Sequence, residues 1–304
     1  MDVSFIIVNW NTRDLLRACL KSVYSTVKGL KFEVFVVDNA SDDGSAEMVR
    51  REFAAACLLV NVENRGFAAA NNQALNLMTG RYAFLLNSDA RLTEGAVAEL
   101  FRFMEGHPEA AMVCGQLLNE DGSKQRSFAS FPTLLTLLTN ESLLEFLCPR
   151  RFPSKRRRYE GPIEVDSCIG AAVMVRKKAI DEVGGLDERY FFFFEETDWA
   201  YAMRRAGWKI YHVPTAFIYH FQGRSIGDTF GPRLEFYRSR YKYFEKWYPR
   251  PYYRAVRILI WVRLLIDCVG TGIFCLLTLG LKGEIRKKWS RYLRLLAWHL
   301  RGEG

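Results

Sequence analysis

The stretch FLLNSDA, residues 84–90, begins with apolar side chains typical of a buried strand and ends on an amide, a hydroxyl and a carboxylate before a final alanine. Asn87 and Asp89 have a purely local interpretation, because short polar side chains at strand ends hydrogen-bond to nearby backbone amides. They also have a functional interpretation, in which the strand carries a ligand site at its tip. The rest of the sequence decides between the two.

Short apolar runs alternate with segments of helical spacing on both sides of this stretch. The predicted strands are residues 3–8, 32–37, 58–62 and 82–86, and the predicted helices are residues 13–27, 46–53, 67–78 and 93–104. Continuous short apolar runs separated by helices are typical of parallel strands covered on both faces. The sequence therefore predicts an α/β fold with a doubly wound, mostly parallel sheet.

Polar residues follow each predicted strand. Asn9, Asp38 and Asn64 occupy these positions in the first three strands, and residues 87–89 do so in the fourth. In such sheets ligands bind beyond the carboxyl ends of the strands. The first strand leads into VNWNT, which lacks the glycine-rich GxGxxG turn of dinucleotide-binding proteins. We therefore expect a ligand site at this edge, but not a nicotinamide or flavin cradle.

The charge of the chain is unevenly distributed. The 304 residues are 49% hydrophobic and 25% charged, as in an ordinary folded protein, and the formal net charge is +9. Residues 1–149 carry 13 basic against 18 acidic side chains, whereas residues 150–304 carry 30 against 16. No nucleic-acid-binding motif accompanies this basic half, so we expect it to meet an anionic membrane surface and no nucleic acid.

The cysteines and the N-terminus indicate a cytoplasmic compartment. The seven cysteines are odd in number and contain no CxxC pair, which favours reduced thiols over a disulfide framework or a zinc knuckle. The first residues, MDVSFIIVNW, lack the basic start and the cleavage site of a secretory signal.

Residues 122–165 interrupt the alternation of strands and helices. Residues 122–126 indicate a turn, residues 134–147 are amphipathic, and the loop RRFPSKRRR, residues 150–158, is strongly basic. This loop is either solvated or in contact with lipid phosphates or a phosphorylated substrate. The chain then predicts a strand at 173–175, a helix at 178–183 and a strand at 208–212.

Two clusters in the second half carry chemistry. Four phenylalanines precede Glu195, Glu196 and Asp198; an apolar wall would make a carboxylate there more basic and able to deprotonate a hydroxyl. A solvated first helical turn is the alternative. Asp89 and His220 supply ligands suited to Mg²⁺ or Mn²⁺, although a lone histidine on an apolar stretch is often a core residue.

These segments together resemble a family 2 glycosyltransferase with the GT-A fold, in the branch of bacterial rhamnosyltransferases and galactofuranosyltransferases. The resemblance rests on SFIIVNWN (4–11), VFVVDNASDDGS (34–45), ENRGFAAANNQAL (63–75), FLLNSDA (84–90), IGAAVMVRKKAIDEVGGLDERYFFFFEETDWAYAMRRAG (169–207) and HFQGRS (220–225). It implies a GT-A (Rossmann-like) sheet covered by helices. It also implies inverting transfer of a sugar from a dTDP- or UDP-sugar to a hydroxyl of a lipid-linked glycan or cell-surface polysaccharide precursor.

The resemblance also assigns roles to single residues. The residues that match the family's nucleotide pocket are Val8, Asn9, Asp38, Asn64, Arg65, Gly66, Asn87 and Ser88. Among them, Asp38 matches the acid that hydrogen-bonds the pyrimidine base of the donor. Asp89 matches the ligand of Mn²⁺ or Mg²⁺ in the DxD motif, and His220 matches the histidine that completes the metal site.

Further matches concern the diphosphate and the acceptor. Arg224 and Ser225 match a segment that contacts the diphosphate, and Glu196 matches the general base, with Glu195 as the alternative. The sequence departs from the family pattern at Asn87, which removes one charge from the DxD motif. It departs again at Glu195-Glu196, where the family usually has Glu-Asp or Asp-Asp.

We expect a catalytic domain over residues 1–225 and a helical, membrane-associating extension over residues 226–304. Residues 252–281 are apolar but contain four charged side chains, so an interfacial helix is favoured over a membrane span or a core helix. The protein would then lie monotopically at the cytoplasmic face of the membrane. The rival functions are a polyprenyl-phosphate sugar transferase, a sugar-1-phosphate nucleotidyltransferase, whose glycine-rich first loop is missing here, and a non-catalytic binding module.

Overall fold

The computed structural model describes residues 1–221, 230–279 and 281–301. Within that part, the chain forms two compact units, Met1–Phe131 with Glu145–Gly227, and Pro132–Leu144 with Asp228–Gly304. Residues 132–144 therefore group with the C-terminal helices, although they lie inside the region expected as the catalytic domain. The domain boundary after residue 225 stays a prediction.

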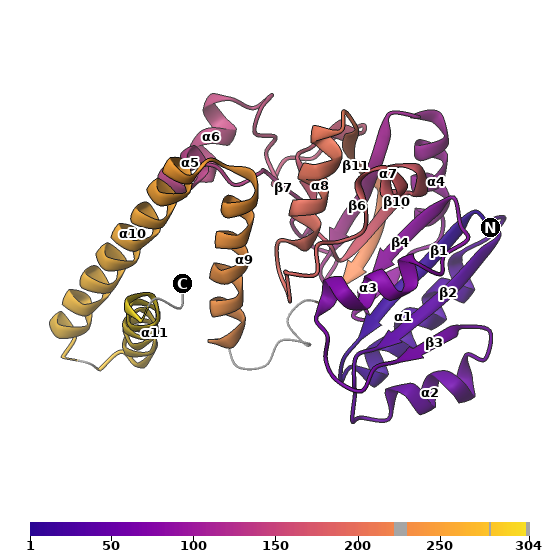
Figure 1. Cartoon of the computed structure of the whole chain (residues 1–304), viewed down its shortest axis with the longest axis horizontal. Helices are drawn as coiled ribbons and strands as arrows, with labels where there is room; N and C mark the ends of the chain where they lie inside the picture. The colour runs from indigo at the N-terminus through magenta and orange to yellow at the C-terminus, as the bar shows by residue number, and fades with distance from the viewer. Residues whose placement is uncertain (222–229, 280, 302–304) are drawn as a thin grey trace. The chain divides into compact units, whose positions relative to one another are not determined.

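The first unit is built on a sheet with strand order β3-β2-β1-β4-β10-β6-β11-β5, to which β8 adds by pairing with β11 (Figure 1). Its strands are β1 (Val3–Asn9), β2 (Phe32–Asp38), β3 (Cys57–Val60), β4 (Tyr82–Leu86), β5 (Ala90–Leu92), β6 (Ala110–Leu118), β8 (Ile163–Glu164), β10 (Ala172–Arg176) and β11 (Lys209–His220). A small separate sheet pairs β7 (Phe128–Ala129) with β9 (Ser167–Cys168). The helices of this unit are α1 (Arg13–Thr26), α2 (Ser45–Glu52), α3 (Phe67–Leu75), α4 (Ala96–Gly106), α6 (Glu141–Leu147, which straddles the boundary), α7 (Lys177–Val183) and α8 (Glu195–Arg205).

The predicted mostly parallel α/β sheet is confirmed. Strand β1 pairs in parallel with β2 and β4, and β11 pairs in parallel with β6, whereas β10 runs antiparallel between β4 and β6. The sheet has an apolar core on each face. Phe5 and Ile7 of β1 pack with side chains of α1, α2 and α4, and Ile6 packs on the other face with side chains of α3, α7 and α8.

The short strands β5, β7, β8 and β9 were not predicted, and two longer strands, β6 and β11, also differ from the sequence prediction. Strand β6 was not predicted, although all nine of its residues are buried. Strand β11 continues to His220 instead of ending at residue 212, and its register against β6 shifts between Val213 and Phe217, around Pro214. A Cβ on Gly115 would lie 2.2 Å from the carbonyl oxygen of Ala216, so a glycine is required opposite this irregularity. The prediction ended the strand before Pro214, because proline is unusual inside a strand. The strand accommodates Pro214 by shifting its register against β6.

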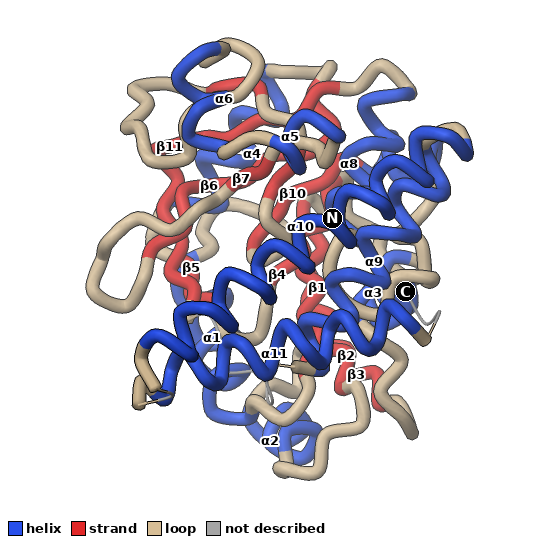
Figure 2. Tube along the Cα trace, turned by 90° about the vertical axis from the view of Figure 1, so that its left-hand side faces the viewer, coloured by secondary structure: helices blue, strands red, loops and turns tan. Residues whose placement is uncertain are grey.

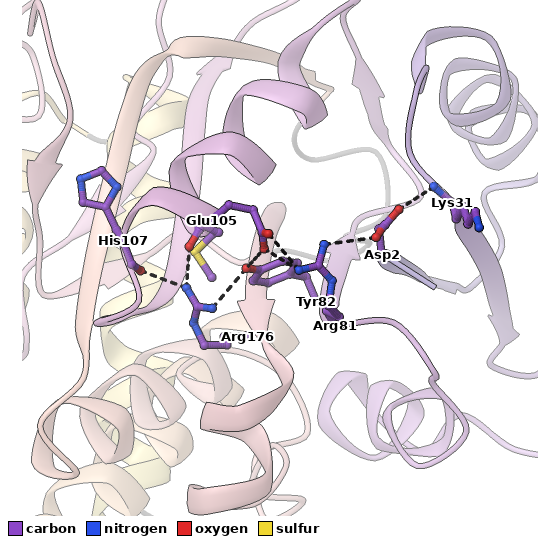
Figure 3. A network of polar contacts seen from close by, with 8 residues as sticks. Asp2, Lys31, Arg81, Tyr82, Glu105, His107 and Arg176 are labelled. Carbon is purple, nitrogen blue, oxygen red and sulfur yellow. Dashed lines mark hydrogen bonds and ion pairs between the residues drawn. The ribbon is translucent and has the colours of Figure 1, made fainter.

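A polar network lies at the edge of the sheet opposite the carboxyl ends of β1 and β4 (Figure 3). Arg176, at the end of the antiparallel β10, donates to the carbonyl oxygens of Met104, His107 and Ala110. It also donates to the hydroxyl of Tyr82, which in turn donates to Glu105. These contacts satisfy carbonyls at the end of α4 and the start of β6, so this edge has a structural role.

The second unit consists of α5 (Leu134–Leu138), α9 (Gly231–Trp247), α10 (Arg250–Leu277) and α11 (Gly283–Leu300). The amphipathic stretch 134–147 is thus two short helices, α5 and α6, instead of one. Helices α10 and α11 form a hairpin (Figure 2), in which a Cβ on Gly272 would lie 2.8 Å from the ring nitrogen of Trp289. The glycine therefore allows the close approach of the two helices.

Helix α10 is long and apolar enough to cross a membrane by length and composition, and 28% of its most apolar 18-residue window is buried. Its buried face is Val256, Ile260, Leu264, Cys268, Gly272 and Cys275. The exposed apolar side chains of the helix are Ile258, Val262, Leu265, Ile266, Val269, Ile273, Phe274, Leu276 and Leu277.

Candidate functional site

The stretch FLLNSDA forms β4, a tight turn and the start of β5. The backbone amide of Ala90 donates to the carbonyl of Asn87 over 3.0 Å, and the amide of Asn87 donates to the carbonyl of Ala171 over 2.9 Å. Strand β5 then pairs antiparallel with β11, which places Ala90 opposite His220. The turn is therefore held by two strands that are distant in sequence.

This pairing brings Asp89 and His220 together. Asp89 Oδ1 lies 3.4 Å from His220 Nε2, and the two residues are only 5% and 7% exposed. The amide of Phe221 donates to the carbonyl of Asp89 over 2.9 Å, which fixes the backbone on both sides of the pair. The sequence proposed both side chains as metal ligands, but their adjacency depends on β11 reaching residue 220.

The donor set fits a hard divalent cation. Besides the carboxylate and the imidazole, the turn contains Asn87, whose Oδ1 is buried and has no hydrogen-bond partner among the described residues. Carboxylate and amide oxygens are preferred ligands of Mg²⁺ and Mn²⁺, and Mn²⁺ also accepts imidazole. Within the described part of the chain, no group of three or more His, Cys, Asp and Glu side chains could hold a metal ion.

Gln125 contacts His220 and was not predicted. Its Oε1 lies 3.0 Å from His220 Nδ1, and its Nε2 donates to the backbone carbonyl of His220 over 2.6 Å. The sequence indicated only a turn at residues 122–126. Nothing in the local sequence around Gln125 indicates that its side chain contacts a residue about a hundred positions away.

A second network joins the carboxyl ends of β1 and β2. Asp38 is 1% exposed, and its two oxygens accept from the Asn9 amide over 3.0 Å and from the backbone N–H of Ser41 over 3.0 Å. Thr12 donates to Asn9 Oδ1 over 2.7 Å and lies 2.8 Å from the hydroxyl of Ser88. This chain of contacts connects Asp38 to Ser88 in the turn after β4.

Asn39 organises the next loop and was missed as a site residue, although it lies in the quoted segment VFVVDNASDDGS. Its side-chain amide donates to Asn64 Oδ1 over 2.8 Å, and its Oδ1 accepts from the backbone N–H of Arg65 over 3.1 Å. Arg65 itself is exposed. Val8, which matches the family's nucleotide pocket, is half-buried near the end of β1.

Gly66 has a structural reason to be glycine. Its φ is +80°, and a Cβ there would lie 2.7 Å from the carbonyl oxygen of Phe191, which also accepts from the amide of Phe67 over 2.8 Å. The glycine thus allows the loop before α8 to approach the backbone closely at this position. Asn72 of α3 holds the same loop through both the N–H and the C=O of Leu186, over 2.9 and 2.8 Å.

The acidic cluster begins α8 directly after a strained backbone. Phe193 and Phe194 have φ values of +69° and +71°, a conformation that is costly for bulky side chains and that concentrates at functional sites. Glu195 is 5% exposed and Glu196 is half-buried, with its side chain beside Gly170, where a Cβ would lie 3.6 Å from Glu196 Cγ. Burial raises the pKa of the Glu196 carboxyl.

Asp198 has a different environment from the two glutamates. It is 2% exposed and accepts from the hydroxyl of Tyr190 over 3.1 Å. Burial and the neighbouring Asp198 carboxylate both raise the pKa of Tyr190. This pair anchors the first turn of α8, which leaves Glu196 as the partly accessible carboxylate of the cluster.

The structure brings the predicted residues into three groups. Asp89, His220 and Asn87 form the first, the Asn9–Asp38 network with Asn64 the second, and Glu195 with Glu196 the third. Among the described residues, no hydrogen bond or ion pair joins Glu196 to Asp89 or His220. Arg224 and Ser225 lie outside the described residues.

The basic loop at residues 150–158 makes specific contacts. Arg151 forms an ion pair with Asp166 over 2.7 Å, and Arg157 lies 6.0 Å from the ring centre of Tyr159. A cavity of about 440 Å³ lies beside the loop. Its lining residues are Phe131, Arg150, Arg151, Pro153, Glu164, Val165, Asp166 and Arg204. The alternatives for this loop, solvent, lipid phosphate or phosphorylated substrate, stay open.

Comparison with known proteins identifies relatives of the chain. The family model described as Glycosyl transferase family 2 matches residues 4–184. An N-acetylglucosaminyl-diphospho-decaprenol L-rhamnosyltransferase of Mycobacterium tuberculosis (strain CDC 1551 / Oshkosh) is 28% identical over 209 residues, which are 64% of this chain and 68% of that protein. The low-salt glycan biosynthesis hexosyltransferase Agl10 of Haloferax volcanii is 25% identical over 211 residues, which are 67% of this chain and 62% of the Agl10 chain.

Among solved structures, S. aureus TarS resembles the chain with a TM-score of 0.54 at 16% identity. The match covers 80% of this chain and 39% of the TarS chain. At that level of identity the likeness concerns the fold alone, and it agrees with the GT-A arrangement expected from the sequence.

Proposed function

This chain belongs to glycosyl transferase family 2, and from that premise we propose that it transfers a sugar, with inversion, from a dTDP- or UDP-sugar to a hydroxyl of a lipid-linked glycan or cell-surface polysaccharide precursor. The observation that carries the proposal is the buried Asp89–His220 pair, beside the unpartnered oxygen of Asn87, at the tip of a central strand. The printed name of the M. tuberculosis relative, which describes a lipid-linked diphosphate acceptor, supports the acceptor class.

The donor would lie along the carboxyl edge of the sheet. In this proposal the Asn9–Asp38 network and the Asn64–Gly66 loop hold the nucleotide, and Asp89 and His220, with Asn87, hold a divalent metal. The bound metal supplies positive charge that stabilises the departing nucleotide diphosphate. Because Asn87 replaces an acid, Asp89 is the only carboxylate of the DxD position, and the diphosphate has to contribute much of the negative charge around the metal.

Glu196 is proposed as the general base. Its Oε takes the proton of the acceptor hydroxyl while the hydroxyl oxygen attacks the anomeric carbon and the bond from that carbon to the diphosphate breaks. A single displacement of this kind inverts the configuration at the carbon. The raised pKa of Glu196 suits proton abstraction, because a more basic carboxylate takes up a hydroxyl proton more readily.

Membrane association is proposed for the helical extension. Helix α10 presents a face of exposed apolar side chains, and α11 adds exposed basic residues at Arg286, Lys287, Lys288 and Arg294. An apolar face combined with basic side chains is typical of helices that lie in the interface of an anionic membrane. We propose monotopic binding at the cytoplasmic face, where lipid-linked acceptors would be available.

Donor profiling tests the proposed function. Purified protein with Mn²⁺ is incubated with dTDP-rhamnose, UDP-galactofuranose or a UDP-hexose, and release of the nucleotide diphosphate is measured by mass spectrometry. Turnover of at least one donor is expected, and no turnover of any would favour the non-catalytic binding module. If Glu196→Gln keeps full activity with a polyprenyl phosphate acceptor, the polyprenyl-phosphate transferase is favoured, since a phosphate acceptor needs no general base.

A further inference from the structure

The side-chain amide of Gln125 has one allowed orientation, set by a chain of contacts in the turn after β6. Asp121 accepts from the hydroxyl of Ser123 over 2.6 Å, and an ionised carboxylate can only accept. Ser123 Oγ therefore accepts from the Asn119 amide over 2.8 Å, which turns Asn119 Oδ1 toward Gln125. Gln125 Nε2 donates to that oxygen over 2.6 Å.

The backbone independently supports the same orientation. Gln125 Nε2 also donates to the carbonyl oxygen of His220 over 2.6 Å, and a carbonyl cannot donate in return. With both acceptors on the nitrogen side, Gln125 Oε1 is the atom that faces His220 Nδ1, 3.0 Å away. Since an amide oxygen only accepts, Nδ1 of His220 has to carry the hydrogen.

This assignment determines what His220 presents to Asp89. In a neutral imidazole with hydrogen on Nδ1, the Nε2 atom is an acceptor, and it lies 3.4 Å from the carboxylate oxygen Asp89 Oδ1. Two acceptors facing one another in a buried place are unfavourable unless a positive charge lies between them. The opposite tautomer would instead donate from Nε2 to Asp89 and occupy the carboxylate.

We propose that Gln125 is a positioning residue that holds the Nε2 lone pair of His220 available for a divalent cation beside Asp89. The inference rests on the metal site of the proposed function. It adds a residue that acts through His220, in the way that partners of the second ring nitrogen fix the tautomer of metal-binding histidines. Without Gln125 the imidazole is free to hydrogen-bond to Asp89, and this contact competes with the cation.

The tautomer can be measured without any metal. ¹⁵N–¹H NMR of metal-free protein labelled at histidine distinguishes the two ring tautomers, and the chain has only four histidines, so His220→Asn identifies the signal. We expect His220 to carry its hydrogen on Nδ1 in the wild type and to shift toward the Nε2–H form in Gln125→Leu. A wild-type His220 with hydrogen on Nε2 would overturn the proposal, whatever the metal data.

Cation binding gives the second measurement. Mn²⁺ is titrated calorimetrically into the full chain saturated with UDP, and Gln125→Leu is expected to bind it 10- to 100-fold more weakly, the usual effect of losing such a partner. Gln116→Leu is the matched control, because Gln116 is a buried glutamine of β6 whose described side-chain hydrogen bonds go to Leu117, Gln125 and Ser127 and not to the imidazole of His220. Equal affinity in Gln125→Leu and wild type, or an equal loss in both variants, contradicts the positioning role.

The two proposals fail in different ways. If the wild type binds no Mn²⁺ in the presence of UDP, the metal site of the proposed function fails. If the wild type binds Mn²⁺ and turns over donor while Gln125→Leu does the same, only the role of Gln125 fails.

Discussion

At the scale of single residues, the proposed metal site at the tip of β4 depends most on Asp89. It is the one carboxylate of the DxD position, because the first position is Asn87. We expect Asp89→Asn to lower donor turnover by at least about 100-fold, the order seen when one group that stabilises transition-state charge is removed. The measurement is release of the nucleotide diphosphate at saturating Mn²⁺, with circular dichroism to verify the fold. Asp42→Asn, at an exposed loop carboxylate, is the control, and undiminished turnover by Asp89→Asn would refute the metal-site assignment.

Glu196 gives a second prediction at this scale. Glu196→Gln is expected to keep donor binding, because the base contacts the acceptor, and to lose transfer by roughly 10²–10⁴-fold. In the wild type, transfer should increase as the pH rises through the raised pKa of Glu196, because only the ionised carboxylate accepts a proton. Rates across pH 5–8 and binding of the nucleotide by calorimetry separate the two effects. If Glu195→Gln is the inactive variant instead, the base is Glu195.

The same carboxyl should reduce stability. A group whose pKa is higher in the folded than in the unfolded state stabilises the fold fully at low pH, and this contribution is lost as the pH rises through the folded pKa. Burial raises the pKa of Glu196, so its ionised form opposes folding at neutral pH. Glu196→Gln should therefore melt at a higher temperature than wild type at pH 7.5, and the difference should shrink toward pH 4. A difference that grows on acidification would contradict the assigned direction.

At the scale of elements, the loop before α8 leads directly into Glu196, the carboxylate that we propose as the base. It is attached to α3 through Asn72 and through the close approach of Gly66 to the backbone of Phe191. We expect Gly66→Ala to lower stability by more than the roughly 1–2 kcal/mol that a positive φ costs an alanine, since its Cβ would overlap a backbone oxygen. Gly95→Ala is the matched control: its φ is +79°, and a Cβ there meets nothing within 4 Å. Denaturant unfolding and donor turnover are measured for both, and equal behaviour would mean that the approach to Phe191 is unimportant.

The elements also show where the sequence was sufficient and where it was not. The first four strands were predicted nearly to the residue because each is an uninterrupted apolar run between helical segments. Strand β11 was cut short in the prediction at residue 212, since Pro214 interrupts the local pattern. The register shift that accommodates this proline depends on Gly115 of a neighbouring strand, and no local pattern in β11 contains that information.

At the scale of the whole molecule, the helical extension should bind anionic membranes. The full-length chain is expected to sediment with vesicles containing phosphatidylglycerol. Ile266→Glu combined with Val269→Glu, at two exposed positions of α10, should weaken vesicle binding at least tenfold. The reason is that burying each apolar side chain in the membrane contributes about 2 kcal/mol to binding. Leu77→Glu, at a similarly exposed apolar position of the first unit, is the control. A full-length chain that stays in the supernatant at low salt would make this unit a packed helical subdomain only.

The sequence by itself determined the class of fold, the edge of the sheet that carries polar side chains, and the family. Each of these depends on patterns within a few tens of residues: apolar periodicity, the residue after a strand, and short motifs in a fixed order. Only the tertiary structure decided that β11 runs on to His220 beside Asp89, that Gly66 makes room for the backbone of Phe191, and that Gln125 faces the imidazole. Such contacts join residues up to about 130 positions apart, and they follow from strand register and loop closure, which local sequence patterns do not encode.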